Sequence, residues 1–344
     1  MLASSDGPLA EAMDLAMLDL DGVVYVGRHA VPGAPAHLGR ARAAGMRLAF
    51  VTNNAARRPS EVAQHLRELG VDAGDSDVVT SAQAAAAVLS ETCGEGAPIA
   101  VLGADGLRAA VSAAGLRPVD VADEAEAIVT GYGPDVRWRD IMRAAARIRN
   151  GLRWVASNTD GSFPADFGLA PGHGALVELV ERFSGVAPTV AGKPAPPLLE
   201  ETIRRVGGAH PLMVGDRLDT DIAGGAAVGV PTLLVLTGVT GLAELVSAEP
   251  TLRPTYLATD LGGLFEEHRA PTEEDGAACS GGWRARVGDD GVLQVSGDGG
   301  GSDWWRAVAT AAWWHLDETG TPAAFDRLTP PHVGADRVEG SLRS

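Results

Sequence analysis

The chain has 344 residues, of which 45% are apolar, and its 45 acidic and 28 basic residues give a net charge of −17. This length suggests about two domains, and the apolar fraction is too high for a disordered chain. The acidic balance argues against a nucleic-acid binder and against binding to anionic lipid. No apolar run is long enough to cross a membrane, the N-terminus does not resemble a signal peptide, and Cys93 and Cys279 have no redox or metal-binding spacing. We therefore expect a cytoplasmic protein.

Two residue types are unusually scarce. Lys193 is the only lysine among the 28 basic residues, the others all being arginine. The only asparagines are Asn53, Asn54, Asn150 and Asn158. Either Lys193 is a chance survivor, or it stands where a planar guanidinium cannot replace a compact ammonium group.

From the N-terminus to about residue 268, short apolar strands alternate with amphipathic helices, which is typical of parallel β-α-β units. The predicted strands are 15–20, 47–52, 99–102, 127–130, 154–156, 188–191, 212–214, 232–236 and 255–258. The predicted helices are 34–44, 60–69, 82–89, 105–114, 138–149, 196–206 and 218–228. We interpret this pattern as an α/β core domain of residues 1–81 and 186–268, with a Rossmann-like doubly wound parallel sheet, interrupted by an inserted α/β cap domain at 82–185.

The composition changes after Arg269. Residues 269–282 resemble a linker, and 283–344 contain five of the seven tryptophans, which suggests a small C-terminal α+β module. A hairpin is expected around Asp290-Gly291, followed by a helix with Ser302 at its N-cap. Because two strands and a helix cannot bury the tryptophans, these must pack on the core, on a longer sheet or on a partner subunit.

The segment D-L-D-G-V closes the first strand and contains two aspartates, Asp19 and Asp21. Residues i and i+2 of a strand point to the same side, and open α/β sheets bind ligands at the carboxyl ends of their strands. Two adjacent carboxylates need a cation between them or a proton on one. The alternative is an acidic turn that faces solvent.

Three further segments end predicted strands in the same way. V-T-N-N closes the second strand with Thr52, Asn53 and Asn54, where a hydroxyl and backbone amides can bind phosphate, although Asn-Asn is also common in loops. G-K-P places Lys193 where its charge could neutralise a phosphoryl group. V-G-D-R-L-D-T-D places Asp216 and Asp221 where they could complete an oxygen-rich cation site, whereas Asp219 is given no role.

These four segments, in this order, resemble the motifs of the haloacid dehalogenase superfamily of phosphohydrolases over about residues 13–268. The inserted block resembles the large cap of the branch that contains nitrophenyl-phosphatase and phosphoglycolate phosphatase. With its tail, the chain is similar to actinobacterial glycerol 3-phosphate phosphatases, whose tail looks like a fragment of an N-acetyltransferase domain.

The resemblance implies an aspartyl-phosphate mechanism with Mg²⁺. It implies that Asp19 is the nucleophile and Asp21 the general acid and base. Thr52 and the backbone of Asn53, with Asn54 beside them, would bind phosphate, and Lys193 would steady the nucleophile and the phosphoryl group. Asp19, Asp21 through its carbonyl, Asp216 and Asp221 would hold the metal ion.

The resemblance also implies that the cap selects the substrate, a small phosphorylated metabolite. The segments 158–163 and 171–175 resemble the return from cap to core, and Phe163 stands where some relatives have a histidine, which argues against pyridoxal phosphate. His173 could equally be a satisfied loop residue or a ligand. Glycerol 3-phosphate is the first candidate substrate, and phosphoglycolate and sugar or nucleoside monophosphates are alternatives.

A different class of function is an inactive binding or scaffold protein with a tail that binds acyl-CoA. A homo-oligomer formed through the cap or the C-terminal module is a further possibility.

Overall fold

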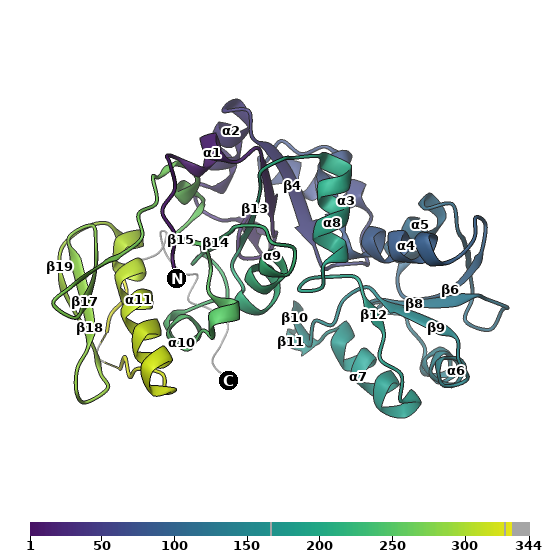
Figure 1. The fold of residues 1–344 in the computed structure, drawn as a ribbon. Helices are drawn as coiled ribbons and strands as arrows, with labels where there is room; N and C mark the ends of the chain where they lie inside the picture. The colour runs from purple at the N-terminus through teal and green to yellow at the C-terminus, as the bar shows by residue number, and fades with distance from the viewer. Residues whose placement is uncertain (166, 327, 332–344) are drawn as a thin grey trace. The chain divides into compact units, whose positions relative to one another are not determined.

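The computed structural model describes residues 1–165, 167–326 and 328–331, and the chain forms two compact units (Figure 1). The first unit contains residues 1–48 and 208–344, and the second contains residues 49–207. The predicted cap boundaries at 82 and 185 both lie inside the second unit, so they stay predictions. The end of the predicted C-terminal module, 332–344, lies outside the described residues. In the part of the chain that is described, no helix is long and apolar enough to span a membrane.

The first unit contains a parallel sheet, a hairpin, a second sheet and five α-helices among its described residues. Its helices are α1 (Leu9–Ala12), α2 (Ala34–Ala43), α9 (Ala223–Ala227), α10 (Leu242–Val246) and α11 (Gly301–Thr319). Its strands are β1 (Leu15–Leu18), β2 (Tyr25–Val26), β3 (His29–Ala30), β13 (Pro211–Gly215), β14 (Thr232–Val235), β15 (Tyr256–Ala258), β16 (Thr272–Glu274), β17 (Ala277–Ser280), β18 (Trp283–Val287) and β19 (Leu293–Gly297). The chain passes into the second unit along β4 (Arg47–Thr52).

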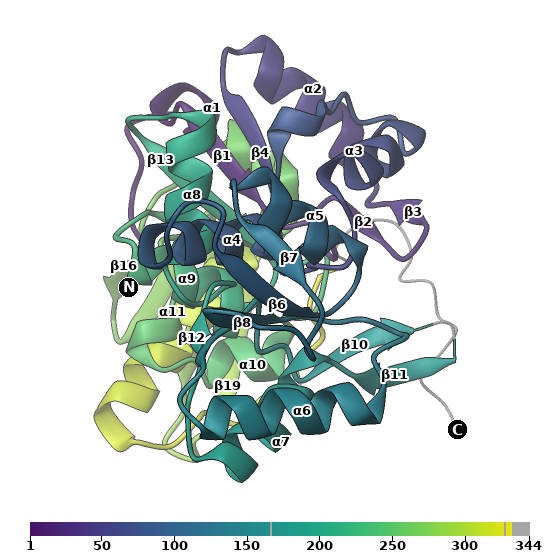
Figure 2. The same ribbon diagram turned by 90° about the vertical axis from the view of Figure 1, so that its right-hand side faces the viewer.

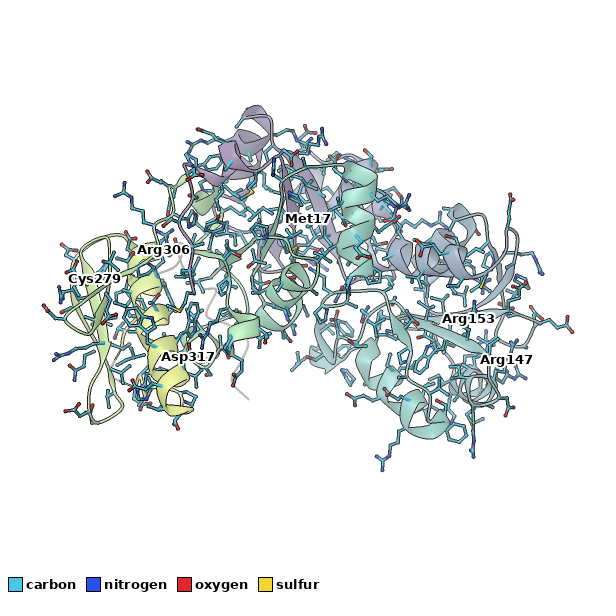
Figure 3. The ribbon with its side chains drawn as sticks, in the orientation of Figure 1. Met17, Arg147, Arg153, Cys279, Arg306 and Asp317 are labelled. Atoms are coloured by element: carbon cyan, nitrogen blue, oxygen red, sulfur yellow. The ribbon has the colours of Figure 1, made fainter. Side chains whose placement is uncertain are left out.

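The parallel sheet of the first unit has the order β15-β14-β13-β1. Every residue of β1 is buried, including Met17, which lies in the interior of this unit (Figure 3). Such continuous apolar strands form because both faces of a parallel sheet are covered. The predicted α/β fold with a parallel sheet is confirmed.

The second unit is also α/β. Its helices are α3 (Pro59–Glu68), α4 (Ser81–Thr92), α5 (Asp105–Ala113), α6 (Trp138–Arg149), α7 (His173–Ser184) and α8 (Pro197–Val206). Its strands, besides most of β4, are β5 (Val78–Thr80), β6 (Pro98–Leu102), β7 (Arg117–Val119), β8 (Ala127–Thr130), β9 (Arg153–Ala156), β10 (Ser162–Ala165), β11 (Gly168–Pro171) and β12 (Thr189–Val190). A parallel sheet of order β12-β9-β8-β6-β7 is covered by α4 and α5 on one side and by α6 and α7 on the other (Figure 2).

The strand predicted at 188–191 does not begin the return to the core sheet. β12 pairs in parallel with β9, with Thr189 opposite Val155, and therefore extends the sheet of the second unit. A two-residue strand carries too little pattern to show which sheet it joins. The chain thus leaves this sheet later than the predicted boundary at 186.

The predicted linker at 269–282 is wrong. These residues form β16 and β17, which pair antiparallel with each other, and β17 pairs with β18. The expected hairpin is present as β18 and β19, so the module has four strands and a helix. Ser302 is not the N-cap of this helix: Gly300 is, and the Ser302 hydroxyl accepts a hydrogen bond from the Thr259 amide.

The glycine-rich loop before α11 is a packing device. A Cβ at Gly297 would lie 2.1 Å from the Gly282 carbonyl oxygen, and one at Gly299 would lie 2.2 Å from that of Gly281. The indole of Trp283 packs beside Gly299 and donates to the Gly300 carbonyl oxygen. The close approach of backbone to backbone accounts for these glycines without a bound acyl-CoA.

Helix α11 is buried along most of its length between the β16–β19 sheet and the core. Trp304 and Trp305 are 4% exposed and Trp313 is fully buried, in one apolar cluster with residues of α10 and β15. The Trp313 indole donates a hydrogen bond of 2.8 Å to the Leu245 carbonyl oxygen. The tryptophans therefore pack on both the core and a longer sheet, two of the three surfaces predicted for them.

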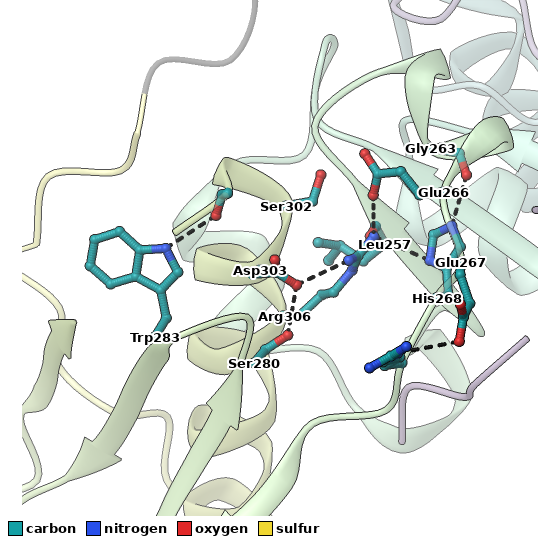
Figure 4. Close-up of polar contacts among 12 residues, drawn as sticks. Leu257, Gly263, Glu266, Glu267, His268, Ser280, Trp283, Ser302, Asp303 and Arg306 are labelled. Atoms are coloured by element: carbon teal, nitrogen blue, oxygen red, sulfur yellow. Dashed lines mark hydrogen bonds and ion pairs between the residues drawn. The ribbon is translucent and has the colours of Figure 1, made fainter. Parts of the chain in front are cut away.

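A buried guanidinium also holds α11 in place (Figure 4). Arg306 is 5% exposed and donates to the Leu257 carbonyl oxygen, to Glu266 at 2.8 Å and to Asp303 at 3.2 Å. Its fourth contact is with His268 Nδ1 at 3.3 Å. Because Arg306 can only donate, His268 Nδ1 is the acceptor and Nε2 carries the proton, which it donates to the Gly263 carbonyl oxygen at 2.8 Å.

The first prediction concerns the packing of α11. Trp313→Ala should lower the free energy of unfolding by about 3–5 kcal/mol, because it removes a fully buried indole and leaves a cavity. Trp138→Ala, at a side chain 61% exposed, is the matched control and should change it by no more than about 0.5 kcal/mol. Urea unfolding followed by circular dichroism measures both, and equal values for the two variants would contradict the burial of α11.

The second prediction concerns pH. Burial, together with the Arg306 charge, lowers the pKa of His268 in the folded protein. The unfolded chain therefore binds more protons near pH 6, so this contribution to stability is present above about pH 6.5 and is lost as the pH falls below it. His268→Gln, which keeps a donor and an acceptor, should reduce the loss of urea stability between pH 7.5 and 5.5. An unchanged pH dependence in this variant would show that His268 does not contribute.

Candidate active site

Three aspartates of the first unit converge at the end of its parallel sheet. Asp19, Asp216 and Asp221 each offer a carboxylate oxygen, and these oxygens lie within 4.8 Å of one another. Asp216 and Asp221 are fully buried and Asp19 is half-buried. Three carboxylates so close together repel one another, and a hard divalent cation is the partner that such oxygen ligands prefer.

Neighbouring strands bring these acids together. Asp19 directly follows β1 and donates its amide to the Val214 carbonyl oxygen at 2.9 Å, while Asp216 directly follows β13. Because β1 and β13 are parallel and adjacent, their carboxyl ends lie at the same edge. The segments D-L-D-G-V and V-G-D therefore meet at this edge of the sheet.

Glycines surround the acids because there is no room for a side chain. Gly22 has φ +87°, and a Cβ there would lie 2.4 Å from Asp216 Oδ2. A Cβ at Gly238 would lie 2.0 Å from the same oxygen, and one at Gly215 would lie 2.1 Å from Asp221 Cβ. The D-x-D-G and V-G-D segments therefore need glycine for close approach as well as for the turn.

Backbone amides fix two of the carboxylates. The Val239 amide donates to Asp216 Oδ2 at 2.6 Å, and the Arg217 amide donates to Asp221 Oδ2 at 3.1 Å. Asp221 lies in a π-helical turn, Leu218–Ile222, where the sequence predicted the start of an ordinary α-helix. Such turns are rare and occur often at functional sites.

Asp21 is not one of the three clustered acids. β1 ends at Leu18, and residues 20–25 form a turn in which the Gly22 amide donates to the Tyr25 carbonyl oxygen at 2.7 Å, so strand alternation does not place Asp21 beside Asp19. Loss of hydration raises the pKa of the Asp21 carboxyl above its ordinary value, and a bond from the Gly27 amide opposes this effect.

Asp219 lies outside the cluster as well. Its carboxylate accepts from Arg217 Nε at 3.0 Å and Nη2 at 2.7 Å, and this ion pair lowers its pKa. The side chain of Asp219 is 63% exposed. Asp219 thus differs from Asp221, two residues away, in both burial and partner.

In the second unit, the segment after β4 is built around its own side chains. The Thr52 hydroxyl oxygen accepts from the Asn54 amide at 3.0 Å, and the Asn54 carboxamide oxygen accepts from the Ala56 amide at 2.8 Å. Asn54 is exposed and stabilises this turn. Thr52 is 9% exposed at the end of its strand.

Lys193, the single lysine, is 2% exposed and lies between β12 and α8, as the sequence predicted. The peptide bond between Lys193 and Pro194 is cis. The carboxamide of Asn53 contacts the Lys193 backbone twice: Nδ2 donates to the carbonyl oxygen at 3.0 Å, and Oδ1 accepts from the amide at 2.8 Å. These two hydrogen bonds link the V-T-N-N segment to the G-K-P segment.

The sequence did not predict helix α7, whose first residue contacts the segment around Asn158. His173 is not a loop residue but the first residue of this helix, 4% exposed, and its Nδ1 donates to the Asn158 carbonyl oxygen at 2.8 Å. Burial lowers the pKa of His173 to about 4, so the ring is neutral. Phe163 packs edge-on against Tyr132, with ring centroids 4.8 Å apart.

Comparisons with known proteins identify the family. One model of haloacid dehalogenase-like hydrolases matches residues 16–117, and a second model of such hydrolases matches residues 190–264. A D-glycerol 3-phosphate phosphatase of Mycobacterium tuberculosis is 42% identical over 89% of this chain and 87% of its own length. The chain belongs to the haloacid dehalogenase-like hydrolases.

Solved structures of this hydrolase family have the same fold. A glycerol phosphate phosphatase from Mycobacterium tuberculosis, solved in complex with calcium, is 41% identical with a TM-score of 0.83, over 92% of this chain and 94% of its own. A p-nitrophenyl phosphatase from Archaeoglobus fulgidus is 29% identical with a TM-score of 0.69, over 74% and 98%. An acid sugar phosphatase of Staphylococcus aureus is 35% identical over 73% of this chain and 96% of its own length.

Proposed function

We propose that this hydrolase is a Mg²⁺-dependent phosphomonoesterase that hydrolyses glycerol 3-phosphate to glycerol and phosphate. The observation that carries the proposal is the convergence of Asp19, Asp216 and Asp221 at the end of the parallel sheet. A scaffold protein that had lost catalysis would not need three buried or half-buried carboxylates in repulsive contact.

The donor set fits a hard divalent cation, since all three side chains offer oxygen. Asp19, Asp216 and Asp221 would hold Mg²⁺, together with the main-chain carbonyl of Asp21. The relative from Mycobacterium tuberculosis has been solved with magnesium, at 41% identity and a TM-score of 0.83. Bound there, Mg²⁺ would mask the charge that otherwise keeps a carboxylate away from a phosphate ester.

The reaction proceeds in two displacements. The Asp19 carboxylate attacks phosphorus and forms an aspartyl-phosphate, while Asp21 gives its proton to the departing alcohol oxygen. Asp21 then takes a proton from water, whose oxygen attacks phosphorus, and phosphate leaves as the Asp19 carboxylate is regenerated.

Residues of the second unit are proposed to bind the phosphoryl group. The Lys193 ammonium supplies positive charge as a compact point charge, which a guanidinium cannot reproduce. Thr52, the Asn53 backbone and Asn54 supply the remaining polar contacts. The identity of the motif residues supports these roles.

The proposed division of labour follows the predicted domains: a core of 1–81 and 186–268 carries out the chemistry, and the inserted segment 82–185 selects the substrate. A homo-oligomer through this segment or through the C-terminal module is also proposed, and the exposed apolar side chains of Met142 on α6 and Phe183 on α7 support the first of these surfaces. A cytoplasmic location is supported by the two free cysteines.

The third prediction tests the nucleophile. Asp19→Asn should abolish turnover of glycerol 3-phosphate, because an amide cannot form the aspartyl-phosphate, while the fold is kept since the side chain is nearly isosteric. Phosphate release measures the activity, and thermal unfolding measures the fold. Turnover comparable to that of the unchanged enzyme would rule out this mechanism.

The fourth prediction tests the metal site with two matched variants. Asp221→Asn should weaken Mg²⁺ binding by about 10- to 100-fold, because it removes a charge from the buried cluster. Asp219→Asn makes the same chemical change at an exposed carboxylate outside the cluster and should leave Mg²⁺ binding unchanged. Calorimetric titration with Mg²⁺ measures both, and a similar loss in the two variants would disprove the assignment.

The fifth prediction concerns the substrate. In a panel of phosphate monoesters, glycerol 3-phosphate should have the highest kcat/KM, above phosphoglycolate, sugar phosphates and nucleoside monophosphates. The relative at 42% identity, named a D-glycerol 3-phosphate phosphatase, supports this ranking. Another ester at the head of the panel would change the substrate without changing the proposed chemistry.

A further inference from the structure

Asparagine is rare in this chain, and two of its four asparagines lie in one hydrogen-bonded network of the second unit. Asn53 and Asn158 take part in this network, whereas Asn150 is an exposed residue at the end of α6. The network contains the backbone of Lys193, the only lysine. Lys193 has a proposed part in phosphoryl binding, so the role of the Asn53 carboxamide that contacts its backbone needs an explanation.

Both amide hydrogens of Asn53 are already used. Nδ2 donates to the Lys193 carbonyl oxygen and to Asp160 Oδ1, each at 3.0 Å. An anionic phosphate oxygen needs a donor, and a carboxamide has no third hydrogen to offer. The Asn53 side chain therefore does not act as a phosphate ligand, and its role lies in the contacts that it makes within the protein.

The Asn53 backbone is fixed in turn. Its carbonyl oxygen accepts from the Ser81 hydroxyl and from Asn158 Nδ2, both at 2.6 Å. Ser81 is fully buried and Asn158 is 4% exposed. The Asn158 carbonyl oxygen is held by the His173 ring at 2.8 Å, so the first turn of α7 supports the same network.

The residue before Lys193 shows how closely the two segments fit. A Cβ at Gly192 would lie 2.7 Å from Asn53 Oδ1 and 2.6 Å from the Ser157 carbonyl oxygen. Only glycine at this position allows the backbone of the lysine segment to lie directly on the Asn53 carboxamide. The fit fixes the backbone from which the Lys193 side chain extends.

We propose that Asn53 is a positioning residue: its carboxamide clamps the amide and the carbonyl of Lys193 and so sets where the lysine ammonium lies. The clamp itself is independent of the proposed function. Only its expected effect on catalysis rests on the proposed role of Lys193 in phosphoryl binding. Asn53→Asp keeps the acceptor for the Lys193 amide but loses both donors, and it brings a carboxylate against the Lys193 carbonyl oxygen and against Asp160. The clamp should then open.

A first experiment tests the clamp through the rate at which Lys193 is chemically modified, and it needs no measurement of enzyme activity. Because the chain has one lysine, an amine reagent such as acetic anhydride modifies only Lys193 and the N-terminal amine, and peptide mass spectrometry separates the two. In full-length protein, Asn53→Asp should raise the rate of Lys193 modification by about 10-fold through local opening of the segment. Asn150→Asp makes the same chemical change at an exposed asparagine and should leave that rate unchanged.

A second variant tests the contact itself. In Asn53→Asp combined with Asp160→Asn, residue 160 becomes the donor and residue 53 the acceptor, which restores one hydrogen bond and removes the repulsion between two carboxylates. The rate of Lys193 modification should then fall back towards that of the unchanged protein. An equal rate in the unchanged protein and in Asn53→Asp would overturn the proposal.

Activity on p-nitrophenyl phosphate connects the clamp to catalysis. Asn53→Asp should reduce kcat by about 10²-fold, the effect of misplacing a catalytic group by ~1 Å, and should cost much less in a Lys193→Ala background. An equal reduction in both backgrounds would show that Asn53 acts independently of Lys193 and would overturn its positioning role in the reaction. Full activity of Lys193→Ala alone would instead refute the proposed role of the lysine, and the modification rates would still decide the clamp.

Discussion

Electrostatic repulsion among carboxylates at the end of a buried parallel sheet is the constraint on which the first unit depends. Asp19, Asp216 and Asp221 lie within 4.8 Å, and two of them have no exposure to water that could screen their charge. Burying an ionised carboxylate is costly unless a positive partner or hydrogen bonds compensate for it. Amide donors from Val239 and Arg217 supply part of the compensation, and a divalent cation bound there would add to it.

The same constraint explains why glycines recur beside these acids. Asp216 is packed against Gly22 and Gly238, and Asp221 against Gly215, at distances where a Cβ would overlap the carboxylate. Backbone at such close range excludes bulk water and orients amide dipoles towards the carboxylates. The order of residues in D-L-D-G and V-G-D therefore follows from packing as much as from chemistry.

The sequence predicted the strand ends well because the signal there is strong. The predicted strands 47–52 and 127–130 match β4 and β8, and Asp19, Asp216 and Lys193 all follow strands as expected. Asp19 and Asp216 were singled out because an apolar strand that stops at a carboxylate is a simple pattern. Two short strands were predicted less well: β5 was missed, and β12 was assigned to the wrong sheet. With three and two residues, they are too short for hydrophobic periodicity to identify them.

The parts that failed depend on contacts between distant residues. Nothing local in 269–282 shows that β16 will pair with β17 and β17 with β18, because that pairing is stabilised by the burial of Trp304, Trp305 and Trp313 against the resulting sheet and the core. Likewise, Ser81 lies in no motif, and the segment 158–163 does not single out Asp160; the bonds of both residues to Asn53 are visible only in the structure.

The tail and the lysine segment each contain a long cationic side chain with little exposure, and the sequence places a different cation in each. Arg306 is 5% exposed and donates to a carbonyl oxygen and two carboxylates, a geometry that uses the spread of donors on a guanidinium. Lys193 is 2% exposed, and its own backbone, rather than its ammonium, is fixed by the Asn53 carboxamide. The chain has arginine at all its other basic positions, and its single lysine stands where the Asn53 carboxamide contacts both the amide and the carbonyl of the main chain. The different shapes of the two cations, and not their equal charge, distinguish these two positions.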